Sequence, residues 1–218
     1  MPGDRKRIAV ESFGGVVLIL LMLPFIQYAL LAGAEGMAGS DQADNRFFSA
    51  DHRMSNIAIF GHMVLGALLA AFIPLQVVSR KRWPLMHRWL GRVLCFAALL
   101  TSVGGLAFIV IRGTIGGVAM DVGFGVYGLL LALCAVQALR HARAGRYGSH
   151  RHWALRLFVL SLGSWLYRVH YGVWYALTGG VASTAAFDGP FDLVQNVAFY
   201  LPYLIVLEIW LRRQGHRI

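Results

Sequence analysis

Charged side chains are scarce in this sequence of 218 residues. They make up 14% of it, whereas a soluble domain carries about a quarter, and hydrophobic residues make up 58%. This balance excludes an ordinary soluble domain. It predicts a membrane protein, in which each crossing segment needs roughly 20 apolar residues to span about 30 Å of hydrocarbon.

Cysteine is nearly absent as well. Cys95 and Cys134 both fall inside apolar runs, which excludes a secreted disulfide scaffold and a CxxC zinc or redox motif. We expect both thiols to pack in the protein interior.

Sequence motifs of several enzyme classes are also missing. There is no P-loop, no GxSxG, no HExxH and no carboxylate-rich metal pattern. These absences exclude the common hydrolase, kinase and nucleotide-binding sites. They leave open whether the protein is an enzyme, with redox chemistry as the remaining option.

Long apolar runs dominate what is present, and there are six of them. They predict an all-α, polytopic bundle of six transmembrane helices that forms one domain over residues 1–218. The helices within about 57–177 are expected to form its core, and those at about 8–31 and 193–211 its periphery. The runs are Ile8–Leu31, Ile57–Val78, Trp89–Ile111, Val118–Leu139, Trp153–Leu177 and Leu193–Leu211.

Lys and Arg are distributed unevenly among the connections between these runs. The amino terminus, residues 80–92, residues 140–156 and the carboxyl tail together hold 16 of the 20 basic residues. Because basic loops stay on the cytoplasmic side, both termini are expected in the cytoplasm of a bacterium, with the chain in the inner membrane. The formal charge of +10 then fits anionic lipid headgroups as partners and needs no nucleic acid.

Two stretches resemble each other: LMHRWLGR (residues 85–92) and SHRHWALR (residues 149–156). Aligning Arg92 with Arg156 also aligns a tryptophan three residues earlier in each stretch. This predicts that the second and third helices are repeated by the fourth and fifth. Alternatively, basic loops and interfacial tryptophans look alike at any cytoplasmic border.

Four histidines lie at paired depths of the predicted bundle. His62 and His170 fall near its outer side, and His87 and His152 near the cytoplasmic border. On one hypothesis they ligate two b-type haems for electron transfer across the membrane, since the helical repeat returns His152 and His170 to one face about 27 Å apart. This layout resembles the cytochrome b561 type of di-haem bundle. On the alternative hypothesis the histidines make structural or lipid contacts, and no other metal is expected.

Further polar side chains are expected in the bundle interior, because ionisable groups at membrane depth need partners. Asp121 is the expected partner of Arg168, while Glu11 and Glu208 are the candidates for neutralising two further arginines. For Glu208, a pair with Arg212 on the same helix is an equal alternative. A polar interior without a cofactor would favour a non-enzymatic protein that binds lipid or a partner subunit. The expected set is Gln76, Arg92, Asp121, Arg156, Arg168 and Glu208.

The motifs from residue 55 to residue 213 resemble a bacterial membrane family known as domain of unknown function 2306. The resemblance rests on RWPLMHRWLGRV, HRHWALR and PYLIVLEIWLRR. It implies a membrane architecture and a residue set, but no reaction. His170 falls outside that set, which by the resemblance comprises His62, Gln76, His87, Arg88, Gly91, Arg92, His152, Trp153, Arg156, Arg168 and Glu208.

Overall fold

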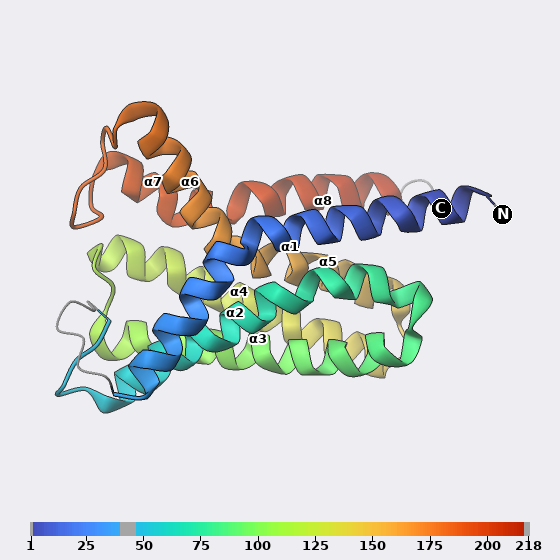
Figure 1. Ribbon diagram of the computed structural model, residues 1–218, viewed down its shortest axis with the longest axis horizontal. Helices are drawn as coiled ribbons and strands as arrows, with labels where there is room; N and C mark the ends of the chain where they lie inside the picture. Colours follow the sequence, from blue (N-terminus) through green and yellow to red (C-terminus); the bar gives the residue numbers. More distant parts are fainter. Residues whose placement is uncertain (1, 40–46, 216–218) are drawn as a thin grey trace. The chain divides into compact units, whose positions relative to one another are not determined.

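The computed structural model describes residues 2–39 and 47–215. These residues form eight helices and no strand, which confirms the all-α prediction (Figure 1). The side chain of Glu11 and the tail residue Arg217 lie outside the described part. The helices are α1 (Pro2–Met37), α2 (Arg53–Arg82), α3 (Pro84–Arg112), α4 (Gly117–Arg143), α5 (Tyr147–Ser161), α6 (Gly163–Thr178), α7 (Pro190–Ala198) and α8 (Leu201–Gly215).

Five segments of the described chain are long and apolar enough to cross a membrane. They are Phe13–Met37, Arg53–Gln76, Pro84–Arg112, Gly117–Arg143 and Pro190–Gln214, the last of which combines α7 with α8. The helix expected over Trp153–Leu177 is missing from this set, because the chain divides there into α5 and α6. The prediction of one continuous helix over that run is therefore wrong. The argument that His152 and His170 share one helix face fails with it.

The chain divides into two compact units, residues 1–101 and residues 102–218, with α3 contributing to both. Cys95 in the first unit and Cys134 in the second are buried, as expected. The expectation of one domain over the whole chain stays a prediction, and the two units are described separately.

In the first unit, α1 packs along α2. Gly33 faces Val64 and Gly36 faces the Phe60 ring, and a Cβ placed on either glycine would collide with that neighbour. Small residues of this kind let helix backbones approach closely where lipid supplies no hydrophobic drive for association. Met22 and Phe60 are fully buried, so α1, which the sequence places at the periphery, contributes to the core of this unit.

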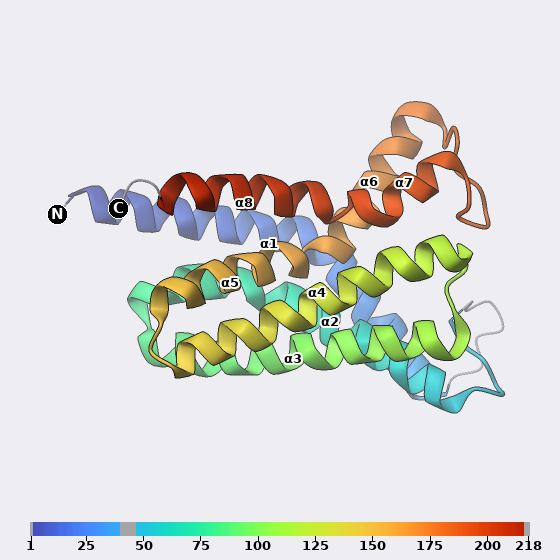
Figure 2. The same cartoon turned by 180° about the vertical axis from the view of Figure 1, so that it is seen from behind.

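In the second unit, α4 packs against both α5 and α7, and α8 packs against α5. Figure 2 shows α8 and α5 running side by side in this unit. Aromatic rings fill the space next to α4: the Phe199 ring lies 5.0 Å from those of Phe124 and Tyr127, between centroids. Phe199 and Leu160 are completely buried, which places the core of this unit around the middle of α4.

The break between α5 and α6 has local causes in the sequence Ser161-Leu-Gly-Ser164. The Ser161 hydroxyl donates to the Leu157 carbonyl at 2.7 Å, a bond that competes with the backbone ladder. Gly163 has a low helix propensity, and a Cβ there would lie 2.8 Å from the Tyr127 ring. Figure 1 shows α6 leaving the direction of α5 at this point.

Proline explains the second break, between α7 and α8. Pro202 has no N–H, so the carbonyl of Ala198 lacks the donor that a continuous helix would provide four residues later. Accordingly α7 ends at Ala198 and α8 begins at Leu201. The segment expected as one helix over Leu193–Leu211 is thus two helices, joined by the buried residues Phe199 and Tyr200.

Candidate functional site

The turn from α2 to α3 is fastened by a histidine. His87, the fourth residue of α3, donates from Nδ1 to the carbonyl of Gln76 at 3.2 Å, and the Gln76 amide donates to the His87 carbonyl at 3.2 Å. Further along α3, the guanidinium of Arg92 lies 5.2 Å from the Trp89 ring centroid, within cation–π range. Gln76 is half-buried and Arg92 is exposed.

The turn from α4 to α5 in the second unit carries the same two contacts. His150, again the fourth residue of its helix, donates from Nδ1 to the carbonyl of Ala138 at 2.9 Å. The Arg156 guanidinium lies 4.7 Å from the Trp153 ring centroid. The sequence led us to His152, which is half-buried, and missed His150. A repeat of helix pairs stays a prediction: aligning Arg92 with Arg156 matches the two arginine–tryptophan contacts but sets His87 against Arg151 and not against His150.

The Arg156 guanidinium also forms an ion pair. It donates from Nε and Nη2 to the two carboxylate oxygens of Glu208 on α8, the second bond being 2.9 Å long. Such a two-point pair fixes both side chains and joins α5 to α8. Of the two partners expected for Glu208, Arg156 makes this direct ion pair, and Arg212 also interacts with the carboxylate electrostatically.

His62 and His170 are hydrogen-bonded within their own units. In the first unit, His62 Nδ1 lies 2.7 Å from the carbonyl of Thr101. In the second, His170 Nδ1 lies 2.9 Å from the Gln195 amide nitrogen and its Nε2 lies 2.7 Å from the Tyr203 hydroxyl. As an iron ligand, His170 would have to give up one of these bonds.

The haem hypothesis pairs histidines from different units, so the pairs His62 with His170 and His87 with His152 stay predictions. The part of the chain that the structure describes has no cluster of three or more His, Cys, Asp or Glu residues that would suit a metal ion.

Asp121 and Arg168 each have a described partner. Asp121 accepts the backbone N–H of Thr114 at 2.6 Å, beside Gly113, which adopts a positive φ of 74°. This contact fastens the short turn before α4. Arg168 is exposed and donates to the Ser164 carbonyl at the start of α6. An ion pair between Asp121 and Arg168 stays a prediction.

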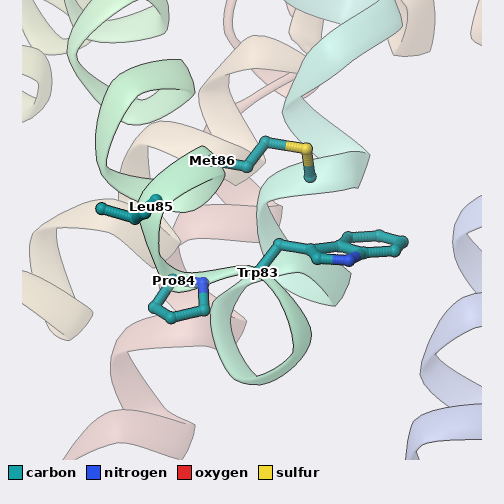
Figure 3. Close-up of a pocket in the computed structure, with 4 residues that line it drawn as sticks. All are labelled: Trp83, Pro84, Leu85 and Met86. Carbon is teal, nitrogen blue, oxygen red and sulfur yellow. The ribbon is translucent and has the colours of Figure 1, made fainter.

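A shallow pocket of about 450 Å³ lies on the turn between α2 and α3. Its lining consists of Trp83, Pro84, Leu85 and Met86, and Figure 3 shows Trp83 and Leu85 pointing to opposite sides of the turn. Leu85 is 70% exposed. Apolar and aromatic side chains next to a basic loop are typical of the membrane–water interface, so we interpret this surface as lipid-facing.

Sequence reasoning missed Asp192, the buried carboxylate at the start of α7. It accepts the hydroxyls of Tyr171 and Ser183 at 2.6 and 2.8 Å and the N–H groups of Thr184 and Gly189 at 2.9 and 3.1 Å. These bonds tie α6, α7 and the loop between them into one hairpin. An acidic residue directly before an apolar run was the available signal.

The two helix breaks of the second unit meet the same stretch of α4, which we call the junction. The Tyr127 hydroxyl donates to the Leu160 carbonyl at 2.7 Å, at the first break. One turn earlier on α4, the Gly123 carbonyl accepts the hydroxyl of Tyr200, at the second break, at 3.3 Å. The first of these bonds takes up a backbone carbonyl at a break, which is the condition for broken helices in membranes. The second joins the residue after α7 to a carbonyl of the continuous helix α4.

Asn196 lies in the last turn of α7 beside the junction. Its residue is 2% exposed, and neither its amide nitrogen nor its amide oxygen has a hydrogen-bond partner. A Cβ placed on Gly123 would lie 3.0 Å from the Asn196 Cβ, so this side chain leaves α7 toward α4. A buried amide left unsatisfied costs about 1–3 kcal/mol, and it therefore requires an explanation.

Comparison with known proteins finds a family match and nothing closer. The family described as predicted membrane protein (DUF2306) matches residues 59–211, which include both fastened turns and the junction. No curated protein and no solved structure matches the chain. With well over half of its length matched, the chain belongs to this family of predicted membrane proteins.

Proposed function

We propose that this protein is a non-enzymatic, multi-pass protein of the bacterial inner membrane that binds anionic phospholipid headgroups at the basic end of its second unit. The observation that carries the proposal is a group of exposed arginines around the α4–α5 turn and the end of α8. The group consists of Arg140, Arg143, Arg146, Arg151, Arg212 and Arg213.

Charge balance supports this proposal. The nearest acidic side chain along these segments, Glu208, is paired with Arg156 and also interacts electrostatically with Arg212. One carboxylate among this many arginines leaves a surplus of positive charge, which attracts anionic headgroups by about 1 kcal/mol for each basic residue near the surface.

The kind of basic residue supports it as well. Of the 20 basic residues in the sequence, 18 are arginines. Arginine presents a planar fork of donors that matches the oxygens of a phosphate, whereas lysine acts as a point charge. Arg151 lies with its guanidinium 5.7 Å from the centroid of the Trp210 ring, and Trp210 is exposed. A cation over an indole at the end of a membrane helix is suited to the headgroup region.

We further propose that both termini lie in the cytoplasm. The support is the basic composition of the connections together with the helix directions within each unit. In the first unit α1 and α2 run in opposite directions, which brings the amino terminus and the α2–α3 turn to one end (Figure 1). In the second unit the Arg156–Glu208 pair and the Arg151–Trp210 contact bring the α4–α5 turn and the end of α8 together. Anionic lipids are concentrated in that leaflet.

The test is thermal unfolding of the full chain in nanodiscs of phosphatidylcholine with and without 30% phosphatidylglycerol. We expect phosphatidylglycerol to raise the melting temperature, and the rise to shrink in the double variant Arg151→Gln/Arg213→Gln. The matched control is Arg53→Gln, which removes an exposed arginine from the other unit and should leave the rise unchanged. An equal rise in all three proteins, or none in the wild type, contradicts the proposal.

Haem binding is the competing hypothesis for the same chain. The hydrogen bonds of His170 favour a structural role over iron ligation, and the resemblance to cytochrome b561 proteins stays a prediction. An absorption spectrum of the purified protein, oxidised and then reduced with dithionite, separates the two. A Soret band that is lost in His62→Ala and His87→Ala would favour the cytochrome hypothesis over ours. Binding of a partner subunit instead would appear as co-purification that survives exchange into phosphatidylcholine.

A further inference from the structure

Two helices of the second unit end at the same stretch of α4. The carboxyl ends of α5 and α7 both reach the junction, where Tyr127 and Tyr200 make the contacts described above. A helix carboxyl end carries partial negative charge on its last carbonyl groups. In membrane transport proteins, the carboxyl ends of discontinuous helices and their unwound carbonyl groups hold monovalent cations.

The Asn196 amide is an independent observation at this place. It lies in the last turn of α7, it is 2% exposed, and its oxygen accepts no hydrogen bond. Two residues further along the chain, the Ala198 carbonyl receives no helical hydrogen bond from residue 202, because Pro202 has no N–H. The end of α7 therefore offers an amide oxygen without a hydrogen-bond partner, close to a carbonyl that lacks its usual helical donor.

The two carboxylates of this region already have hydrogen-bond or ion-pair partners. Asp192 accepts four hydrogen bonds from Tyr171 and from the loop between α6 and α7, and Glu208 is paired with Arg156. Divalent cations such as Ca²⁺ and Mg²⁺ are held largely by carboxylates. Neutral oxygens without a carboxylate instead suit a cation with a single charge.

The close packing of α4 and α7 limits the size of any ligand here. A Cβ placed on Gly123 would lie 2.5 Å from the Asn196 carbonyl oxygen, so the two backbones are in direct contact. Arg168, which carries a charge on α6, is exposed and donates to the Ser164 carbonyl. Contact this close favours a single ion over a larger molecule.

We propose that the junction binds one monovalent cation, held by the Asn196 amide oxygen and by backbone carbonyls at the carboxyl end of α7. This site is separate from the exposed arginines proposed to bind lipid, and neither proposal depends on the other.

The test measures thermal unfolding of the purified full chain in an uncharged detergent, by intrinsic tryptophan fluorescence. Sodium chloride and potassium chloride are compared with N-methylglucamine chloride at equal ionic strength and pH. We expect at least one of the alkali cations to raise the melting temperature by about 2 °C or more, with saturation as its concentration rises. Equal melting temperatures in the three salts at every concentration overturn the proposal.

Substitutions of Asn196 locate the site. Asn196→Leu should abolish the cation-specific shift, and Asn196→Asp, which adds a charge, should produce the half-maximal shift at a cation concentration at least threefold lower. The matched control is Gln195→Leu, which removes a neighbouring amide bonded to His170 and should keep the shift. A shift that persists in Asn196→Leu overturns the proposal. Where Asn196→Leu does not fold, an unchanged cation dependence in Asn196→Asp overturns it equally.

Discussion

The α2–α3 turn and the α4–α5 turn begin alike and continue differently. Each has a histidine at the fourth position of its second helix bound to a carbonyl of the preceding helix, and each has an arginine over a tryptophan. Beyond the turn, α3 runs for 29 residues without interruption, whereas α5 ends after 15. The same local turn is therefore compatible with a spanning helix and with a broken one.

The difference can be traced to four aligned positions. With Arg92 set against Arg156, the residues Ala97-Ala-Leu-Leu100 of α3 correspond to Ser161-Leu-Gly-Ser164 at the end of α5. Alanine and leucine favour helix, while glycine and serine disfavour it and serine competes for backbone groups. The comparison indicates that a short stretch of sequence causes the break. The hydrogen bond from Tyr127 of the neighbouring helix α4 then stabilises it.

The largest expected difference between the turns concerns their arginines. Arg156→Leu leaves Glu208 without its partner and should lower the free energy of unfolding by about 2–3 kcal/mol, less than for a fully buried pair because the two side chains are 21% and 37% exposed. Arg92→Leu, on the exposed counterpart, should cost under about 1 kcal/mol. Titration from dodecylmaltoside into SDS, followed by fluorescence, measures both. Equal losses of unfolding free energy in the two variants would mean that the arginines contribute equally to the stability of the two turns.

A smaller effect is expected at the break itself. Gly163→Ala places a methyl group 2.8 Å from the Tyr127 ring and should cost about 1–2 kcal/mol, although alanine is the better helix former. Gly172→Ala in the middle of α6 is the control, because nothing lies within 4 Å of its Cβ, and it should be neutral or slightly stabilising. The same SDS titration applies. A stabilising Gly163→Ala would show that helix propensity outweighs packing there, and that the break is not held by Tyr127.

The smallest effects should be shared by the two turns. His87→Ala and His150→Ala each remove one hydrogen bond to a carbonyl and should each cost about 1 kcal/mol. Melting temperatures of the two variants, measured side by side, test this expectation. A loss of stability in only one of the two variants would contradict the parallel between the turns. A larger loss of stability in His152→Ala would mean that His152, which the sequence suggested, is the more important histidine of the α4–α5 turn.

Most of the helices could be predicted from the sequence, because long apolar runs have few alternatives in a bilayer. The break at Leu162 was hidden for the same reason: hydropathy averages over about 19 residues, and a Ser-Leu-Gly-Ser segment hardly lowers that average. Pro202 gave a clearer local signal for the second break. Hydropathy alone still predicts one helix there, because an apolar run continues on both sides of Pro202.

The candidate site was less predictable than the fold. The rule that charges in a membrane need partners left Glu208 with a tertiary arginine and Arg212 as equal candidates, and the structure shows the ion pair with Arg156. His150 and Asn196 did not follow from any rule, since their roles depend on Ala138 and Gly123 of a neighbouring helix. Contacts of this kind arise from tertiary packing, which a single sequence does not encode in any local pattern.

The hydrogen bonds of Asp192 have a consequence for the way the protein is made. A lone carboxylate costs about 3 kcal/mol when a segment enters the bilayer, so α7 is poorly suited to insert by itself. Its four donors come from α6 and from the loop that precedes α7, and all of them leave the ribosome earlier. We therefore expect α6, the loop and α7 to be inserted together as a closed pair, late in synthesis, and only after the donors are in place.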